Sequence, residues 1–133
     1  MINEQLAHYQ RKLAYEIDSA DLFDTLEGND AQQIVVIDTR KKFAYDEEHI
    51  PGATSLPHRE MNETTTQHLD RNKTYICYCD GIGCNGSTNG ALKMTKLGFK
   101  VKELIGGLDW WKRDGYATEG VKATQGTQIQ CAC

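Results

Sequence analysis

Two apolar patterns alternate along the chain. In the first, short runs of adjacent apolar residues, many of them β-branched, are bounded by polar residues, as in the buried strands of a parallel sheet. In the second, apolar residues recur at helical spacing and mark one buried face. The runs predict strands at residues 34–37, 54–56, 74–79 and 101–104, with an edge strand at 15–17. Helices are expected at residues 2–13, 41–48, 87–97 and 108–113, and between an N-cap at Ser19 and Gly28.

Strands and helices that take turns along a chain are typical of an α/β fold. We therefore expect a mostly parallel open sheet of about five strands, with right-handed crossovers and with helices on both faces. The domain is expected to span residues 15–118, preceded by an N-terminal helical extension at 1–14 that packs on its outside. Residues 119–133 are rich in Gly, Thr and Gln and are expected to form a flexible tail.

Composition and charge exclude several classes of protein. The 133 residues, of which 39% are hydrophobic and 26% charged, suit one globular domain with a core of its own. No apolar run reaches the roughly 18 residues of a bilayer span, and residues 1–15 lack the apolar block of a signal peptide. We therefore expect a cytoplasmic protein without membrane contact and with reduced thiols. The net charge of -4, with Lys and Arg clustered only at 40–42, argues against a nucleic-acid partner.

Three of the five cysteines lie within the stretch TYICYCDGIGCNGST, residues 74–88. An odd number of cysteines fits poorly with a framework of structural disulfides, which leaves chemistry, metal binding or burial to explain them. Cys77 lies among apolar strand residues and is predicted to be a small buried side chain. Zinc binding by Cys77, Cys79 and Cys84 is disfavoured because their spacing lacks the usual two-residue knuckle, and no metal is expected.

Cys79 ends a predicted strand, and ligands of an open α/β sheet gather at the carboxyl ends of its strands. Glycines in the loop that follows let the backbone curl so that successive N–H groups point inward and bind an anion. The next helix adds the positive end of its dipole. Such surroundings lower the pKa of a thiol, which would make Cys79 a nucleophile. The amides expected around its sulfur belong to Asp80, Gly81, Ile82, Gly83, Cys84, Asn85 and Gly86.

The rim of the pocket is expected to hold polar side chains from neighbouring loops. Asp38 and Arg40 follow the strand at 34–37 and so belong to the same edge of the sheet as the cysteine. Either they form an ion pair that fixes their loop, or Arg40 supplies a positive charge to the substrate. His58 is a further rim candidate, and whether it or His49 forms a Cys/His pair is left open.

Four segments resemble the rhodanese-like sulfurtransferases in order and spacing over residues 34–116: IVVIDTR, EEHIPGATSLP, YICYCDGIGCNGST and LGFKVKELIGGLDWWKRDGY. The resemblance implies that the cysteine at the strand end accepts a sulfane sulfur from a donor such as thiosulfate and holds it as a persulfide among the loop amides. The sulfur then passes to cyanide, a small thiol or a thiol protein, without a cofactor. By position this cysteine is Cys79, because counting from Cys84 leaves too little room for a loop and a helix before Gly98.

The loop departs from the family pattern at two points. It has Asp80 and no Arg or Lys near its far end, where the family's cation helps to hold thiosulfate, so thiosulfate is an uncertain donor. It is also longer and has a second thiol, and in this it is similar to a subgroup with the loop YC-x-G-x-GCNG. There Cys84 would receive sulfur from Cys79 or close a disulfide on it. The roles of Cys131 and Cys133, and the oligomeric state, are left open.

Two other functions fit the same fold. Related phosphatases and arsenate reductases use a cysteine in a longer anion-binding loop, but their loops end in an arginine that is absent here. A non-catalytic rhodanese module for docking or redox sensing would not need a cysteine in a glycine-rich loop. We therefore expect a sulfurtransferase that acts through a persulfide on Cys79.

Overall fold

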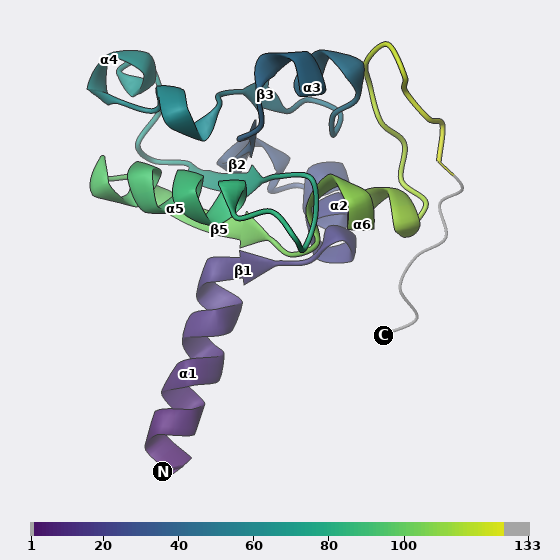
Figure 1. The fold of residues 1–133 in the computed structure, drawn as a ribbon. Coiled ribbons are helices and arrows are strands. Elements are labelled where there is room, and N and C mark those ends of the chain that lie inside the picture. Colours follow the sequence, from purple (N-terminus) through teal and green to yellow (C-terminus); the bar gives the residue numbers. More distant parts are fainter. Residues whose placement is uncertain (1, 127–133) are drawn as a thin grey trace.

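The computed structural model describes residues 2–126 and contains a five-stranded sheet with helices around it (Figure 1). The helices are α1 (Ile2–Tyr15), α2 (Ser19–Glu27), α3 (Lys42–Glu47), α4 (Glu63–Thr66), α5 (Gly86–Lys96) and α6 (Gly107–Arg113). The strands are β1 (Glu16–Ile17), β2 (Ile34–Asp38), β3 (Thr54–Ser55), β4 (Thr74–Tyr78) and β5 (Lys100–Leu104). The short 3₁₀ helices η1 (Ala31–Gln33) and η2 (His58–Glu60) lie in connecting segments. Every predicted strand is present, with its ends within one residue of the prediction.

All strand pairs of the sheet are parallel, in the order β1-β5-β4-β2-β3, which confirms the predicted α/β fold. The register of β2 and β4 places Asp38 beside Tyr78. The hydrogen bond from the Thr39 amide to the Tyr78 carbonyl (3.0 Å) continues this pairing past the strand ends. The segments that begin at Thr39 and Cys79 therefore leave the sheet side by side, at the edge where the candidate site was expected.

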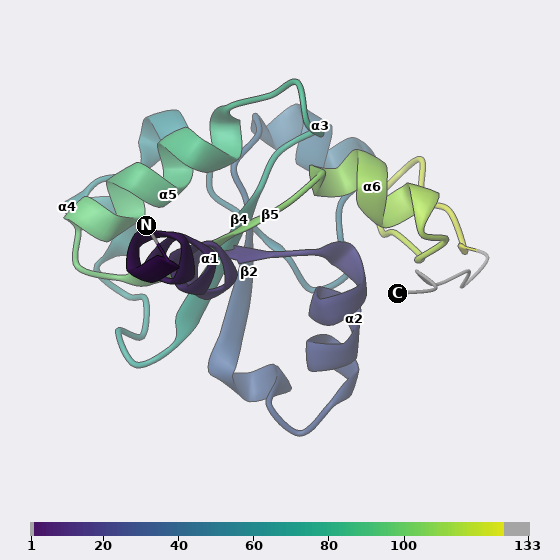
Figure 2. The same cartoon turned by 90° about the horizontal axis from the view of Figure 1, so that it is seen from below.

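Helices cover both faces of the sheet, as predicted (Figure 2). Side chains of β2 and β4 alternate between the faces, because successive residues of a strand point to opposite sides. Val36 and Ile76 pack on one face against α2 and α6. Ile37 and Cys77 pack on the other face, where Met94 of α5 covers them. Both faces are apolar, which is why the central strands read as continuous apolar runs.

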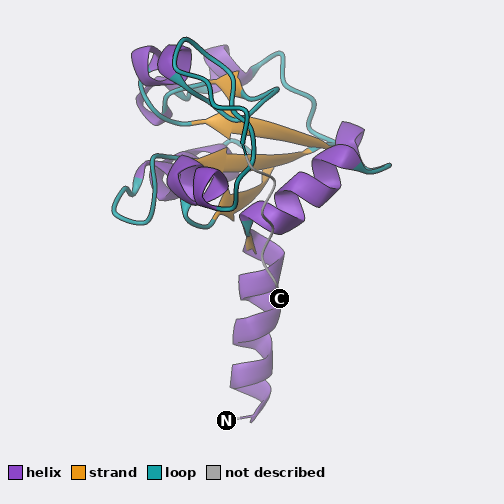
Figure 3. Cartoon of the chain, turned by 90° about the vertical axis from the view of Figure 1, so that its right-hand side faces the viewer, coloured by secondary structure: helices purple, strands orange, loops and turns teal. Residues whose placement is uncertain are grey.

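Helix α1 forms where the pattern predicts it, but the expectation that it packs on the outside of the domain is wrong. It projects away from the sheet, and only its carboxyl end approaches β1 and β5 (Figures 1 and 3). The apolar stripe Ile2, Leu6, Tyr9 and Leu13 is 80%, 56%, 53% and 77% exposed. Helical periodicity predicts which residues share a face of the helix, but it does not specify what covers that face.

Two helix starts differ from expectation. The N-cap of α2 is Asp18, whose side chain accepts a hydrogen bond from the Asp21 amide (2.8 Å), while Ser19 is buried inside the helix. Asp and Ser both cap helices well, so the N-cap preference of the residue type does not decide between Asp18 and Ser19. Helix α4 was not predicted, although Asn62 and Thr65 form a reciprocal capping box at its start. Four residues are too few for an apolar period.

Part of the predicted flexible tail, residues 119–133, is held by hydrogen bonds. The backbones of Glu119 and His49 exchange hydrogen bonds of 2.8 and 2.9 Å. The amides of Val121 and Lys122 donate to carbonyls near the carboxyl end of α3, at 3.1 and 2.7 Å. Composition predicts little local structure here, but the unpaired carbonyls at a helix end accept hydrogen bonds from any nearby backbone.

Candidate active site

The base of the candidate loop is fixed by the start of α6. The amides of Leu108 and Asp109 donate to the carbonyls of Cys79 and Asp80, at 3.0 and 2.8 Å. This contact needs the preceding glycine turn, since Gly107 has a φ of +56° and a side chain there would collide with the Cys79 backbone. The position of Cys79 is therefore set by both β4 and α6.

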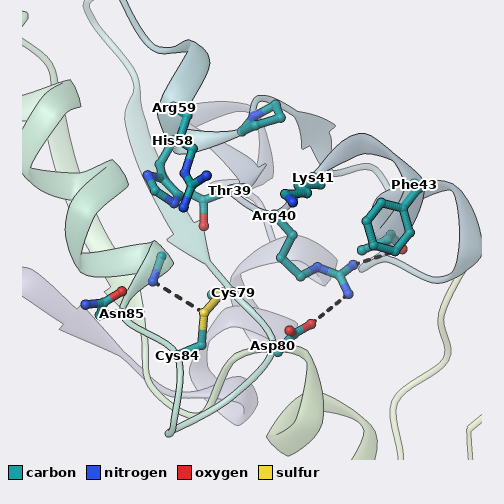
Figure 4. Close-up of a pocket in the computed structure, with 13 residues that line it drawn as sticks. Thr39, Arg40, Lys41, Phe43, His58, Arg59, Cys79, Asp80, Cys84 and Asn85 are labelled. Carbon is teal, nitrogen blue, oxygen red and sulfur yellow. Dashed lines mark hydrogen bonds and ion pairs between the residues drawn. A yellow bond between two sulfur atoms is a disulfide. The ribbon is translucent and has the colours of Figure 1, made fainter.

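Cys79 and Cys84 form a disulfide in this structure (Figure 4). Their Cα atoms are 6.3 Å apart, within the usual range for a disulfide, and a hydrogen bond from the Cys84 amide to the Gly81 carbonyl (3.1 Å) closes the turn between them. The expectation of reduced thiols does not hold for this pair. It was drawn from the expected compartment, whereas the turn brings the two sulfur atoms together.

Gly86, the first residue of α5, lies against both sulfur atoms. Its N–H donates to the Cys84 sulfur at 3.4 Å. A Cβ on Gly86 would lie 2.8 Å from the Cys79 sulfur and 3.4 Å from the Cys84 sulfur. The positive end of the α5 dipole therefore points at the sulfur pair, where it favours negative charge.

The predicted cradle of loop amides is not assembled around Cys79 in this disulfide form. Within residues 2–126, Gly86 is the only loop residue whose amide donates to sulfur, and it donates to Cys84. A disulfide sulfur has no negative charge to attract N–H groups, and for the thiolate or persulfide form the amide cradle stays a prediction. Ile82 lies at the tip of the loop and is 79% exposed.

Arg40 forms a buried ion pair with Asp38. Its guanidinium lies 2.7 Å from the Asp38 carboxylate and 3.1 Å from that of Asp80, and it also donates to the Glu48 carbonyl at 2.6 Å. The Arg40 side chain is 8% exposed, so its N–H groups donate to other residues of the protein and not to a ligand. This arrangement corresponds to the first of the two interpretations above, an ion pair that fixes the loop.

Asp38 is held from a second side by Tyr78. The Tyr78 hydroxyl donates to the Asp38 carboxylate at 2.7 Å and accepts from the Ile50 amide at 3.1 Å. Burial raises the pKa of Tyr78, and the negative charge of Asp38 raises it further, so the phenol stays protonated and keeps donating. The ends of β2 and β4 are thereby joined by side chains as well as by backbone.

A cavity of about 340 Å³ opens above the sulfur atoms, and its rim is cationic (Figure 4). Lys41 and Arg59 line it, are exposed, and make no ion pair with any residue from 2 to 126. Phe43, 66% exposed, adds an apolar surface beside them. The loop itself has no cation, so these side chains from two neighbouring segments are functional candidates that the loop motif does not reveal.

His58 also lines this cavity, whereas His49 does not. Burial lowers the pKa of His58, and the positive charges of Lys93 and Arg59 lower it further, so the imidazole is neutral at pH 7. Its Nδ1 is buried without a hydrogen-bond partner among the described residues. His49 stacks on Tyr45 instead, and neither imidazole hydrogen-bonds to a described sulfur.

A second cavity, of about 200 Å³, lies on the other side of the disulfide. Both Cys79 and Cys84 line it, so the sulfur pair separates the two cavities. Glu103 lines this cavity and accepts hydrogen bonds from Ser87 and Thr88, at 3.2 and 2.9 Å. Its carboxylate is therefore occupied by hydroxyl donors of α5.

Two site types have no counterpart in the part of the chain that the structure describes. In residues 2–126, no three His, Cys, Asp or Glu side chains are grouped so that they could hold a metal ion. The same residues include no helix with the length and apolar character needed to cross a membrane. Cys131 and Cys133 lie outside the described residues.

Comparisons with known proteins agree with this geometry. The profile of the rhodanese-like domain matches residues 19–114. The thiosulfate sulfurtransferase GlpE of Coxiella burnetii is 36% identical over 83 residues, which cover 61% of this chain and 74% of that protein. The crystal structure of the BH2092 protein from Bacillus halodurans is 41% identical, with a TM-score of 0.89 over 99% of this chain and 96% of that one. The rhodanese-like domain of the Anabaena protein Alr3790 is 28% identical, with a TM-score of 0.70 over 80% of each chain. The chain therefore belongs to the rhodanese-like domain family.

Proposed function

We propose that this protein is a sulfurtransferase that carries sulfane sulfur as a persulfide on Cys79. The observation that carries the proposal is the contact of Gly86 with the Cys79 sulfur. This contact is so close that residue 86 has no room for a side chain. The sulfur lies at the end of a central strand and at the amino end of α5, where negative charge is favoured.

The reaction starts from the reduced form of the Cys79–Cys84 pair. The Cys79 thiolate attacks the outer sulfur of thiosulfate, a new S–S bond forms, and the S–S bond of the donor breaks with release of sulfite. The persulfide left on Cys79 bears negative charge on its outer sulfur, which the amides of the loop from Gly81 to Gly86 are proposed to stabilise. A thiol or cyanide then attacks the outer sulfur and returns the Cys79 thiolate.

Anionic donors suit the larger cavity. Lys41 and Arg59 are proposed to supply the positive charge that the loop lacks, since neither side chain forms an ion pair with another described residue. Thiosulfate is a donor candidate because the similar GlpE protein is a thiosulfate sulfurtransferase. An organic persulfide is the other candidate, because a cavity of about 340 Å³ with Phe43 at its side also accommodates an organic group.

Redox sensing by a non-catalytic module is the second candidate function, and the Cys79–Cys84 disulfide is the observation that favours it. Phosphatase or arsenate reductase activity is disfavoured, because the loop has no arginine and the guanidinium of Arg40 is occupied by Asp38 and Asp80.

Intact mass spectrometry separates these functions. The reduced protein is incubated with thiosulfate and, separately, with cysteine persulfide, then analysed as wild type, Cys79→Ser and Cys84→Ser. Sulfur transfer predicts a gain of one sulfur atom in Cys84→Ser and no gain in Cys79→Ser. No sulfur uptake by Cys84→Ser with either donor, together with reversible disulfide formation in the wild type, would support redox sensing instead. Turnover of an aryl phosphate without sulfur uptake would support the phosphatase.

A further inference from the structure

We infer that Cys84 is a resolving thiol that discharges the Cys79 persulfide as hydrogen sulfide, so that a dithiol is a second substrate of this protein. The inference rests on the proposed persulfide at Cys79. It differs from the proposed function in where the sulfur goes, because sulfide leaves without an external acceptor having attacked the persulfide.

The disulfide shows which atom Cys84 reaches. Its sulfur is bonded directly to the sulfur of Cys79. In a persulfide this atom is the inner sulfur, and the outer sulfur would lie further from the Cys79 backbone. The turn from Gly81 to Cys84 delivers it there by a backbone hydrogen bond of 3.1 Å. In the persulfide form the same turn directs Cys84 at the inner sulfur, the atom whose attack expels the outer one.

The surroundings favour Cys84 as the attacking group. The Gly86 amide donates to its sulfur at 3.4 Å, and the amino end of α5 favours the thiolate, which is the reactive form. The turn holds Cys84 beside the inner sulfur, whereas an external thiol must first enter a cavity to reach it. The sulfur pair has open space on two sides, since both cysteines line both cavities, and a leaving sulfide has room.

The step balances as a thiol–disulfide exchange. The Cys84 thiol gives its proton to the negatively charged outer sulfur, and the resulting Cys84 thiolate attacks the Cys79 sulfur. The bond from that sulfur to the outer sulfur breaks, and HS⁻ leaves with the bonding electron pair and the transferred proton. The disulfide of this structure is the product, and it retains the two oxidising equivalents that the persulfide carried. A dithiol, either a small molecule or a protein, then reduces it to two thiols and becomes a disulfide itself. The net reaction converts one sulfane sulfur and one dithiol into one sulfide and one disulfide.

A single-turnover experiment on the full chain tests this. Protein reduced and freed of reductant receives one equivalent of cysteine persulfide, and released sulfide is measured together with the intact mass after alkylation. The same measurement on Cys79→Ser gives the sulfide that the donor itself releases, and this amount is subtracted from the other values. The wild type should release about one sulfide per loaded chain and end as the Cys79–Cys84 disulfide. Cys84→Ser and Cys84→Ala should instead keep the added sulfur on Cys79 and release none until a thiol is added.

Cys77→Ala is the matched control, because Cys77 is fully buried within β4 and forms no disulfide. It should behave as the wild type. A Cys131→Ser, Cys133→Ser double variant should do the same, which shows that the tail thiols are not the resolving groups; loss of sulfide in this variant would overturn the inference.

Two results would overturn the inference and leave the proposed function intact. One is a wild-type persulfide that persists without sulfide release. The other is transfer of the added sulfur to Cys84, found by peptide mapping, which would make Cys84 a relay. If folded Cys84→Ser and Cys84→Ala, checked by circular dichroism, take up no sulfur from either donor, then the proposed function fails and the inference fails with it.

Discussion

The α-carbon of Gly86 is so close to the sulfur of Cys79 that an added methyl group would lie 2.8 Å from it. The backbone of Gly86 is that of the first turn of α5, so alanine is conformationally acceptable there and the closest conflict is with the Cys79 sulfur. The relationship ties the start of a helix to one atom of the candidate site.

Gly86→Ala should therefore slow sulfur loading by about tenfold or more. Overpacking costs about 1–3 kcal/mol, and a barrier change of about 1.4 kcal/mol corresponds to a factor of ten in rate. The loading rate is measured by mass spectrometry after reduction. Leu92→Ala, on the exposed face of the same helix, is the control for changes in helix stability and should load at the wild-type rate. Unchanged loading in Gly86→Ala would contradict a role for this contact.

Removing the buried cation should destabilise the protein far more than removing its exposed partner. Arg40→Ala leaves the fully buried carboxylate of Asp38 unpaired, and breaking a buried pair costs about 3–5 kcal/mol. Asp80→Ala removes a partner that is 72% exposed, which should cost about 0–1 kcal/mol. Urea unfolding of both variants gives the free energy of unfolding. Equal losses would show that the Asp38 pair is not what holds the loop.

Neutralising the rim of the larger cavity should weaken donor binding without affecting the chemical step. Lys41→Gln and Arg59→Gln should each raise the KM for thiosulfate by about two- to fivefold, as expected for exposed charges worth up to about 1 kcal/mol, with kcat unchanged. The effect should shrink at high salt, which screens exposed charges.

Lys42→Gln is the control for that prediction. Lys42 is adjacent in sequence and equally cationic, but it pairs with Asp46 at 2.9 Å and does not line the cavity. If Lys42→Gln raises KM as much as Lys41→Gln does, then the net charge of the protein, and not the cavity rim, governs donor binding.

The pKa of His58 predicts a pH dependence of stability. Burial and the charges of Lys93 and Arg59 lower this pKa in the folded protein, so the unfolded chain binds a proton at higher pH than the folded one. The free energy of unfolding should therefore fall as pH drops through about 6.5, the ordinary pKa of histidine. In His58→Gln, urea midpoints measured above and below that pH should differ less than in the wild type. An unchanged difference would assign the pH dependence to other groups.

Cys77 should resist alkylation in the folded protein. Burial, with a further contribution from Glu103, raises its pKa to about 12, so the reactive thiolate is scarce near neutral pH. After reduction, iodoacetamide should modify Cys84 and Cys79 in the native protein and Cys77 only after unfolding, as peptide mapping shows. Alkylation of native Cys77 at the rate of Cys84 would contradict its burial.

Much of the fold follows from local sequence. The run at β2 is apolar at every position before Asp38, and this pattern alone indicates a strand covered on both faces. The position of Cys79 at a strand end, with a glycine-rich loop after it, likewise identified the candidate loop. The exposed face of α1, by contrast, could not be predicted, since a helical period fixes a stripe but not its partner.

The candidate site was predictable only in part. Its loop is one continuous segment, whereas Lys41 and Arg59 come from two other segments. The sequence around these two residues has no pattern that predicts their proximity to Cys79. Arg40 was placed correctly at the edge of the sheet, but its role was ambiguous, because an ion pair with Asp38 and Asp80 depends on burial that spacing does not reveal.

The sequence by itself determined the order of strands and helices, the strand-end position of Cys79 and the glycines that surround it, because these depend on periodicity and backbone freedom over a few neighbouring residues. Only the tertiary structure decided that Cys84 bonds to Cys79, that Gly86 contacts both sulfur atoms and that the positive charge of the site comes from outside the loop. Those features depend on distances between segments, which are set when β2, β4, α5 and α6 pack together.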